Sequence, residues 1–272
     1  MTSLASTFSN LRANNRKAFI PFISLGDPNL DATRVFLSEL AKAGATTMEL
    51  GFPYSDPIAD GAVIQASYTR ALANRTSMGD LLRFAQSLQE SAETSGTPRV
   101  AMLSYSLIHR RGIANFVEQA KASHIGGLIV PDLPVEESTH LLALTRQAGL
   151  DLIQLVTPTT PKERAKRILD SSSGFVYCVS IAGITGERKE LPPQLLEQLA
   201  WLRSQTDLPL CVGFGISRPD QVEILRNHCD GVIVGSALVR LCEQVGKKTI
   251  LQVASEIGTL ARSLIQALHP VS

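Results

Sequence analysis

The sequence feature that most limits the possible folds is a regular alternation of short apolar runs with longer amphipathic segments. Each of eight apolar runs of strand length is followed by a segment whose apolar residues repeat at helical spacing. The runs are AFIPFISLG, TTMELG, RVAMLSYSL, GGLIVPDLP, DLIQLVTP, GFVYCVSIAG, LPLCVGFG and DGVIVGSALV. Continuous apolar strands that alternate with helices indicate a parallel sheet covered by helices.

The intervening segments carry the boundary signals of helices. LDATRVFLSELAKAGA stops at Gly44, VEESTHLLALTRQAG begins with acids and ends at Gly149, and PKERAKRILDSSS opens with Pro161. No linker or change of composition divides the chain. We therefore predict an α/β fold, a (β/α)8 TIM barrel forming a single domain over 1–272, with an extra N-terminal helix. A doubly wound open sheet is the weaker alternative, because no GxGxxG follows the first strand.

Composition excludes several functional classes. The formal net charge is +1, and one Trp and four Tyr give little aromatic surface, so neither the charge nor the stacking platform of a nucleic-acid-binding protein is present. The four cysteines show no CxxC spacing, which argues against a zinc site. The N-terminus lacks a signal-peptide pattern, and no apolar stretch reaches membrane-spanning length. We expect a reduced, cytoplasmic protein without a metal.

Three carboxylates gather in MELGFPYSDPIADGAVIQ at 48–65. Glu49 lies inside an apolar strand, where an unpaired carboxylate is costly. It is either a structural acid with a partner or a general acid/base whose pKa is raised by apolar surroundings. Asp56 fits ordinary turn chemistry, and Asp60 before Gly61 could cap the next helix. In barrels of this class the active site lies at the carboxyl ends of the strands, and this stretch lies at such an end.

Glycines follow three strands at the same face of the predicted barrel. GFG at 213–215 follows the seventh strand, Gly235 and Ser236 follow the eighth and begin a helix, and ITG at 184–186 follows the sixth. Backbone amides at such loops and helix N-termini bind phosphate groups in these barrels. Each glycine signal is weak alone, but the three together favour a phosphorylated ligand.

Six stretches together resemble one known family. PFISLGDP, MELGFPYSDPIADGAVIQ, VPDLPVEES, SIAGITG, VGFGIS and VGSALV occur in the order and spacing of the tryptophan synthase alpha subunit. The resemblance implies cleavage of indole-3-glycerol phosphate to indole and glyceraldehyde 3-phosphate, with no metal or organic cofactor in this chain. It also implies an αββα heterotetramer with a beta subunit that carries pyridoxal phosphate and receives the indole.

The resemblance assigns roles to the residues that match the family motifs. Glu49 would be the acid/base of the retro-aldol cleavage, Asp60 would stabilise charge on the indole nitrogen, and Tyr177 would lie beside the substrate. Asp56 would lie near the partner subunit. The apolar slot for indole would comprise Phe22, Leu103 and Phe214, with Thr185 on a closing loop, and the phosphate site would comprise Gly186, Gly215, Gly235 and Ser236.

One departure from the family pattern keeps an alternative function open. After the third strand the family usually has Tyr-x-Asn, whereas this chain reads SYSLIHRRG and its loop looks about one residue shorter. That loop helps to face the beta subunit, so the chain could be a free-standing indole-releasing lyase. A barrel that only activates its partner is the third hypothesis, and the Glu49 and Asp60 pair argues against it.

Overall fold

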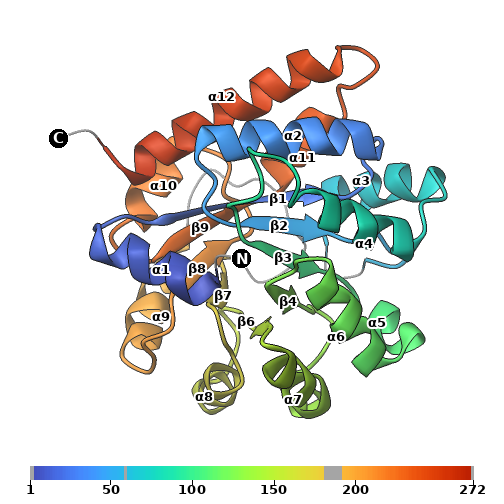
Figure 1. Cartoon of the computed structure of the whole chain (residues 1–272). Coiled ribbons are helices and arrows are strands. Elements are labelled where there is room, and N and C mark those ends of the chain that lie inside the picture. Colours follow the sequence, from blue (N-terminus) through green and yellow to red (C-terminus); the bar gives the residue numbers. More distant parts are fainter. Residues whose placement is uncertain (1–2, 58–59, 181–191, 271–272) are drawn as a thin grey trace.

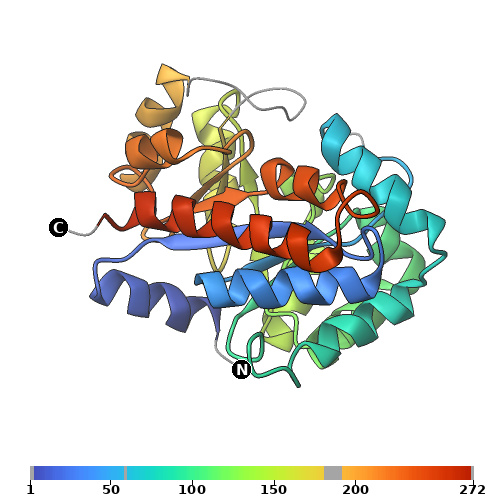
Figure 2. The same cartoon turned by 90° about the horizontal axis from the view of Figure 1, so that it is seen from above.

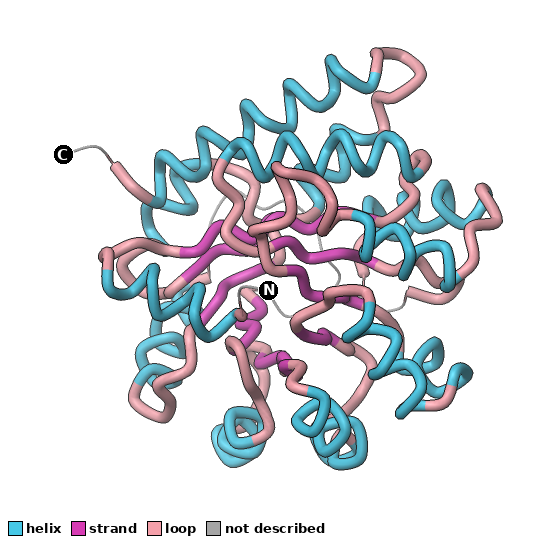
Figure 3. The backbone as a smooth tube through the Cα atoms, in the orientation of Figure 1, coloured by secondary structure: helices cyan, strands magenta, loops and turns pink. Residues whose placement is uncertain are grey.

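Parallel strands form a barrel at the centre of the molecule, and helices surround it (Figure 1, Figure 3). The computed structural model describes residues 3–57, 60–180 and 192–270. Within these residues the strands are β1 (Ala18–Ser24), β2 (Met48–Gly51), β3 (Arg99–Met102), β4 (Gly127–Ile129), β5 (Asp151–Ile153), β6 (Leu155–Val156), β7 (Val176–Val179), β8 (Leu210–Gly213) and β9 (Gly231–Val234). The predicted barrel is confirmed, with its N-terminal helix.

Helices follow most strands and cover the outside of the sheet. Figure 2 shows α2 and α12 side by side on one flank. The helices are α1 (Leu4–Ala13), α2 (Leu30–Ala43), α3 (Ala62–Ala73), α4 (Met78–Ser87), α5 (Tyr105–Arg111), α6 (Ile113–Ala122), α7 (Thr139–Ala148), α8 (Lys162–Asp170), α9 (Pro193–Arg203), α10 (Pro219–Leu225), α11 (Ser236–Cys242) and α12 (Ile250–Leu268), with the 3-10 turn η1 (Val135–Glu137) before α7.

The barrel closes through a strand that changes partners. All pairs are parallel, and the order is β5-β4-β3-β2-β1-β9-β8-β7-β6. The run DLIQLVTP, predicted as one strand, is divided at Gln154 into β5, which pairs with β4, and β6, which pairs with β7. The two ends of the sheet are therefore consecutive in the chain. The nine strands of the described residues correspond to the eight predicted ones.

Alternating side chains divide the core into two layers. Ala18, Ile20 and Phe22 of β1 belong to the cluster inside the barrel, whereas Phe19 and Ile23 pack between the sheet and the helices. Helix α1 joins the inner cluster from the amino ends of the strands, because its Leu4 and Phe8 are buried there. The ring centroids of Phe8 and Phe175 are 5.7 Å apart.

The two helix ends predicted at glycine are observed, whereas the two predicted starts differ. The acids Glu136 and Glu137 lie in η1, and α7 begins after them at Thr139. Gly44 and Gly149 end α2 and α7 in the left-handed conformation, with φ of 105° and 77°. Pro161 is the N-cap of α8 rather than a residue of its first turn.

Helix α5 takes up the end of the run RVAMLSYSL, which was predicted as strand throughout, and the loop predicted after it. Ser104 caps α5 through the backbone N–H of Ser106. The carboxylate of Asp132 accepts hydrogen bonds from the Ser104 hydroxyl at 2.6 Å and from the Tyr105 N–H at 2.8 Å.

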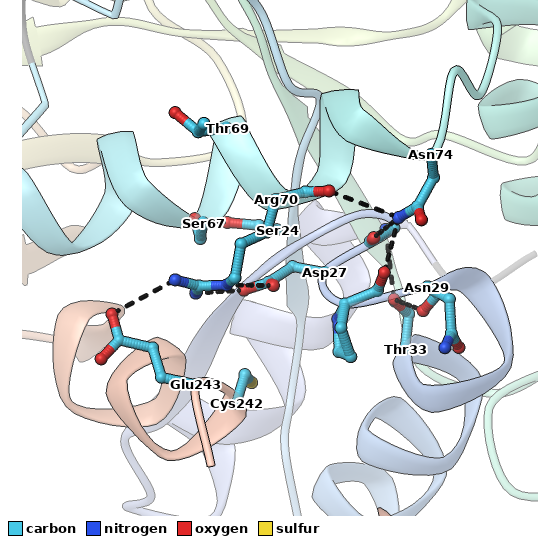
Figure 4. A network of polar contacts seen from close by, with 12 residues as sticks. Ser24, Asp27, Asn29, Thr33, Ser67, Thr69, Arg70, Asn74, Cys242 and Glu243 are labelled. Carbon is cyan, nitrogen blue, oxygen red and sulfur yellow. Dashed lines mark hydrogen bonds and ion pairs between the residues drawn. The ribbon is translucent and has the colours of Figure 1, made fainter. Parts of the chain in front are cut away.

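A partly buried ion pair joins the loop after β1 to helices α3 and α11. Figure 4 shows Arg70 of α3 between Asp27 and Glu243. The guanidinium donates to both carboxylate oxygens of Asp27 at 2.8 Å, and it lies 3.4 Å from Glu243. Asn74 donates to the carbonyl oxygens of Gly26 and Pro28 in the same loop. These contacts fix α3 and α11, whose first residues reach the carboxyl ends of the strands.

Candidate active site

A small cavity at the carboxyl ends of the strands contains most of the predicted site residues. It has a volume of about 40 Å³. Its lining residues are Phe22, Glu49, Asp60, Ile64, Met102, Tyr177, Phe214, Gly215, Ile233, Gly235 and Ser236. Drug-sized ligand pockets have volumes of roughly 300–1,000 Å³, so this cavity is much smaller than a pocket that holds an organic ligand.

Glu49 is completely buried in β2. Its neighbours in register are Phe22 of β1 and Val100 of β3. Neither carboxylate oxygen has a hydrogen-bond partner among the described residues. Burial, and to a smaller extent the negative charge of Asp60, raises the pKa of Glu49 to about 8. Its carboxyl group therefore holds a proton at neutral pH and is free to transfer it.

Asp60 lies just before helix α3 and is 2% exposed. It does not cap that helix, because the N-cap is Gly61 and no side chain bonds there. The Tyr54 hydroxyl donates a hydrogen bond to Asp60 Oδ2 at 3.3 Å. Burial raises the pKa of Asp60 to about 6, and the bond from Tyr54 opposes this shift. The two neighbouring acids therefore differ in protonation at neutral pH: Glu49 is mostly protonated and Asp60 mostly ionised.

Tyr177 and Phe214 form one wall of the cavity. Their ring centroids are 5.6 Å apart and the planes meet at 64°. Phe214 has a φ of 72°, a conformation that a bulky residue rarely adopts, and the Ser180 hydroxyl donates to its carbonyl oxygen. Backbone strain of this kind is typical of residues whose position matters more than their local energy.

The predicted phosphate residues are only partly described. Gly215, Gly235 and Ser236 line the same cavity as the two acids, from the loop after β8 and the start of α11. Gly186 and Thr185, predicted for the phosphate site and the closing loop, lie outside the described residues.

Leu103 does not reach the cavity. It follows β3 and packs in the layer between sheet and helices, whereas Met102, one position earlier, faces the barrel interior and lines the cavity. The alternation of a strand could have shown this, because Val100 and Met102 share one face and Ala101 and Leu103 share the other.

Two tyrosines near Asp60 were not identified from the sequence. Tyr54 bonds to Asp60, and Tyr68 of α3 packs against the Tyr54 ring with centroids 5.4 Å apart. Tyr54 lies six residues before Asp60, and Tyr68 lies eight residues after it. No motif in the sequence indicates that either residue belongs to the site. Asp56 is exposed and accepts a bond from Ser55, so it takes no part in the cavity.

A larger cavity of about 400 Å³ opens beside the site, between the loop after β4 and helix α8. It shares Phe214 with the small cavity, and neither acid lines it. Among the described residues, no group of three His, Cys, Asp or Glu side chains could hold a metal ion. No described helix is long and apolar enough to cross a membrane.

Comparisons with known proteins agree on one family. The sequence model of the tryptophan synthase alpha chain matches residues 8–268. The alpha chain of Rhodopirellula baltica is 48% identical over 98% of this chain and 99% of its own length.

Solved structures give the same result. The tryptophan synthase subunit alpha of Legionella pneumophila superimposes with a TM-score of 0.89 at 35% identity, over 100% of both chains. A chain of the tryptophan synthase complex from Pyrococcus furiosus gives 0.80 at 34% identity, over 94% of this chain and 99% of its own. The chain therefore belongs to the tryptophan synthase alpha chain family.

Proposed function

We propose that Glu49 and Asp60 together carry out the bond cleavage of this alpha chain. As a family member the chain is a lyase of tryptophan biosynthesis, which cleaves indole-3-glycerol phosphate to indole and glyceraldehyde 3-phosphate. The family carries no cofactor of its own, so the chain's own side chains must supply the acid/base chemistry. The observation that carries the assignment is that both buried acids line one cavity at the strand ends, Glu49 without a hydrogen-bond partner among the described residues and Asp60 bonded by Tyr54. Their different surroundings fit an acid/base role for one and a charge-stabilising role for the other.

Glu49 acts first as an acid and then as a base. Its carboxyl group gives a proton to carbon 3 of the indole ring, which makes the ring an electron sink. The bond between carbon 3 and the glycerol chain then breaks, and its electron pair restores the aromatic ring. The hydroxyl next to that bond becomes the aldehyde and returns its proton to the Glu49 carboxylate. Glu49 is thus protonated again at the end.

Asp60 stabilises the charge that develops between these steps. Protonation at carbon 3 places positive charge on the indole N–H, and an ionised carboxylate in a buried site interacts with it strongly. A pKa of about 6 keeps Asp60 mostly ionised at neutral pH, although only 2% of the residue is exposed to solvent. Tyr177, Phe22 and Phe214 would hold the flat ring.

The backbone at Gly215, Gly235 and Ser236 would bind the phosphate group. These residues line the cavity from the loop after β8 and from the start of α11. Glycine lets backbone N–H groups approach an anion closely. Gly186, which lies outside the described residues, stays a predicted contributor to the phosphate site.

Indole release by three matched variants tests these roles. Glu49→Gln should abolish release while retaining substrate binding, and Asp60→Asn should lower kcat by about 10²–10³. Glu118→Gln, an exposed acid of α6, should match the wild type. Wild-type activity in Glu49→Gln would refute the assignment.

We also propose that the chain works in the cytoplasm in an αββα complex with a tryptophan synthase beta subunit that carries pyridoxal phosphate. The family membership and the Pyrococcus furiosus complex support this partner. Indole release should rise sharply when a beta subunit is added. Fast release that does not change when the beta subunit is added would instead identify a free-standing lyase. If the wild type releases no indole and Glu49→Gln still stimulates the beta subunit as the wild type does, the chain is an activator.

A further inference from the structure

Asp60 is bonded by Tyr54, and the ring of Tyr54 packs against a second tyrosine, Tyr68. Tyr54 lies between β2 and Asp60, and its hydroxyl donates to Asp60 Oδ2 at 3.3 Å. Tyr68 belongs to α3 and is 1% exposed. The planes of the two rings meet at 50° with centroids 5.4 Å apart, so Tyr68 supports the ring of Tyr54 from behind.

The two tyrosine hydroxyls differ in what they contact. The Tyr54 hydroxyl bonds to Asp60, whereas the buried Tyr68 hydroxyl has no hydrogen-bond partner within the described ranges. Tyr68 does not line the cavity, and neither does Tyr54. Both residues therefore act on the site only through Asp60 or through packing.

We propose that Tyr54 is a positioning residue for the cleavage reaction, holding the Asp60 carboxylate ionised and aimed at the indole nitrogen, with Tyr68 as its packing support. This inference rests on the role proposed above for Asp60. A phenol suits the task because it donates a hydrogen bond without adding a positive charge. A lysine or arginine in its place would neutralise the carboxylate that must stabilise the developing charge on indole.

Several titratable groups surround Asp60. Glu49 of β2 faces it, as do Tyr54 from the loop, Tyr68 from α3 and Tyr177 from β7. Burial raises the pKa of Asp60, and the Tyr54 bond lowers it. Loss of that bond must therefore raise the pKa of Asp60, while Glu49, which Tyr54 does not bond, should titrate nearly as before.

The pH dependence of kcat/KM separates these two acids. The reaction needs Asp60 ionised and Glu49 protonated, so the profile should be bell-shaped, with limbs near the pKa values of about 6 and about 8. Tyr54→Phe keeps the ring and removes the donor. It should move the acid limb up by about 0.5–1 pH unit and leave the basic limb in place.

Tyr68→Phe is the matched control, because it keeps the ring contact and removes a hydroxyl that has no hydrogen-bond partner among the described residues. Its profile should equal that of the wild type. An unmoved acid limb in Tyr54→Phe, or an equal shift in Tyr68→Phe, would overturn the proposal. Urea unfolding confirms that each variant is folded. Tyr54→Leu provides a second variant, which should share the acid-limb shift and lose kcat at every pH.

Asp60→Asn distinguishes failure of this inference from failure of the proposed function. If Asp60→Asn is nearly inactive and the Tyr54→Phe profile is unchanged, Asp60 keeps its role and Tyr54 has none. If Asp60→Asn cleaves the substrate at the wild-type rate, the role of Asp60 itself fails, and the role of Tyr54 fails with it.

Discussion

A β carbon placed on Gly213 would lie 2.5 Å from the hydroxyl oxygen of Tyr177. Gly213 ends β8, and Tyr177 lies on the neighbouring strand β7. The Tyr177 ring extends toward Gly213. Real contacts of a β carbon are never so short, so a side chain at position 213 would have to displace the Tyr177 ring. Because Gly213 has no side chain, the Tyr177 ring can line the cavity beside Phe214.

Gly213→Ala should therefore impair the reaction more than the fold. We expect kcat/KM for indole release to fall on the order of tenfold to a hundredfold, because small displacements in an active site are costly. Gly96→Ala is the matched control, since nothing lies within 4 Å of a β carbon there and its φ is not positive. Equal activities of the two variants would show that Tyr177 can move without consequence.

The burial of Glu49 should make stability depend on pH. Its folded pKa of about 8 exceeds the ordinary glutamate pKa of 4.5, so between these pH values the folded chain holds a proton that the unfolded chain has released. This contribution to stability is complete below pH 4.5 and is lost as the pH rises to 8.

Glu49→Gln removes this dependence. The variant should be more stable than the wild type by about 3 kcal/mol at pH 8, and the difference should shrink towards pH 5. Urea unfolding at both pH values measures it. A difference that is the same at pH 5 and pH 8 would mean that Glu49 titrates normally.

The barrel could be predicted because its strands are buried on both faces and therefore read as unbroken apolar runs. The division of the fifth strand at Gln154 could not be predicted, because a change of strand partner does not alter the local hydropathy pattern. Helix α5 was also missed, because its cap depends on Asp132, 28 residues from Ser104 in the chain. The extent of a single domain over 1–272 stays a prediction.

The site was predicted in part, and for two different reasons. Glu49 was identified from chemistry, since an acid in an apolar strand needs an explanation. Asp60 was identified from a resemblance, since its local pattern also fits a helix cap. Tyr54 and Tyr68 were missed because the contact between their rings and the bond from Tyr54 to Asp60 arise only when the chain folds.

The four cysteines should resist modification in the folded chain. Cys178, Cys211, Cys229 and Cys242 are all buried and free, and burial raises the pKa of each thiol. A thiol reagent at pH 8 should react negligibly with the native protein over minutes and should titrate four groups in urea. Rapid reaction of a native thiol would reveal an opening of the core around it.

The ion pair between Arg70 and Asp27 should carry much of the stability of the loop after β1. The Asp27 side chain is 2% exposed, and removal of the guanidinium would leave its carboxylate buried without a charge partner. Arg70→Gln should therefore lower the free energy of unfolding by about 2–4 kcal/mol, somewhat less than for a fully buried pair because Arg70 itself is 32% exposed.

Arg83→Gln is the matched control, because Arg83 pairs with Asp80 at the surface, where the side chains are 72% and 42% exposed. Its stability should hardly change. The double variant Asp27→Asn/Arg70→Gln should recover part of the loss, since a neutral amide costs less to bury than an unpaired carboxylate. Urea unfolding of the wild type, Asp27→Asn, Arg70→Gln and the double variant closes the cycle. If Arg70→Gln costs no more than Arg83→Gln, α3 is held by its packing and not by this ion pair.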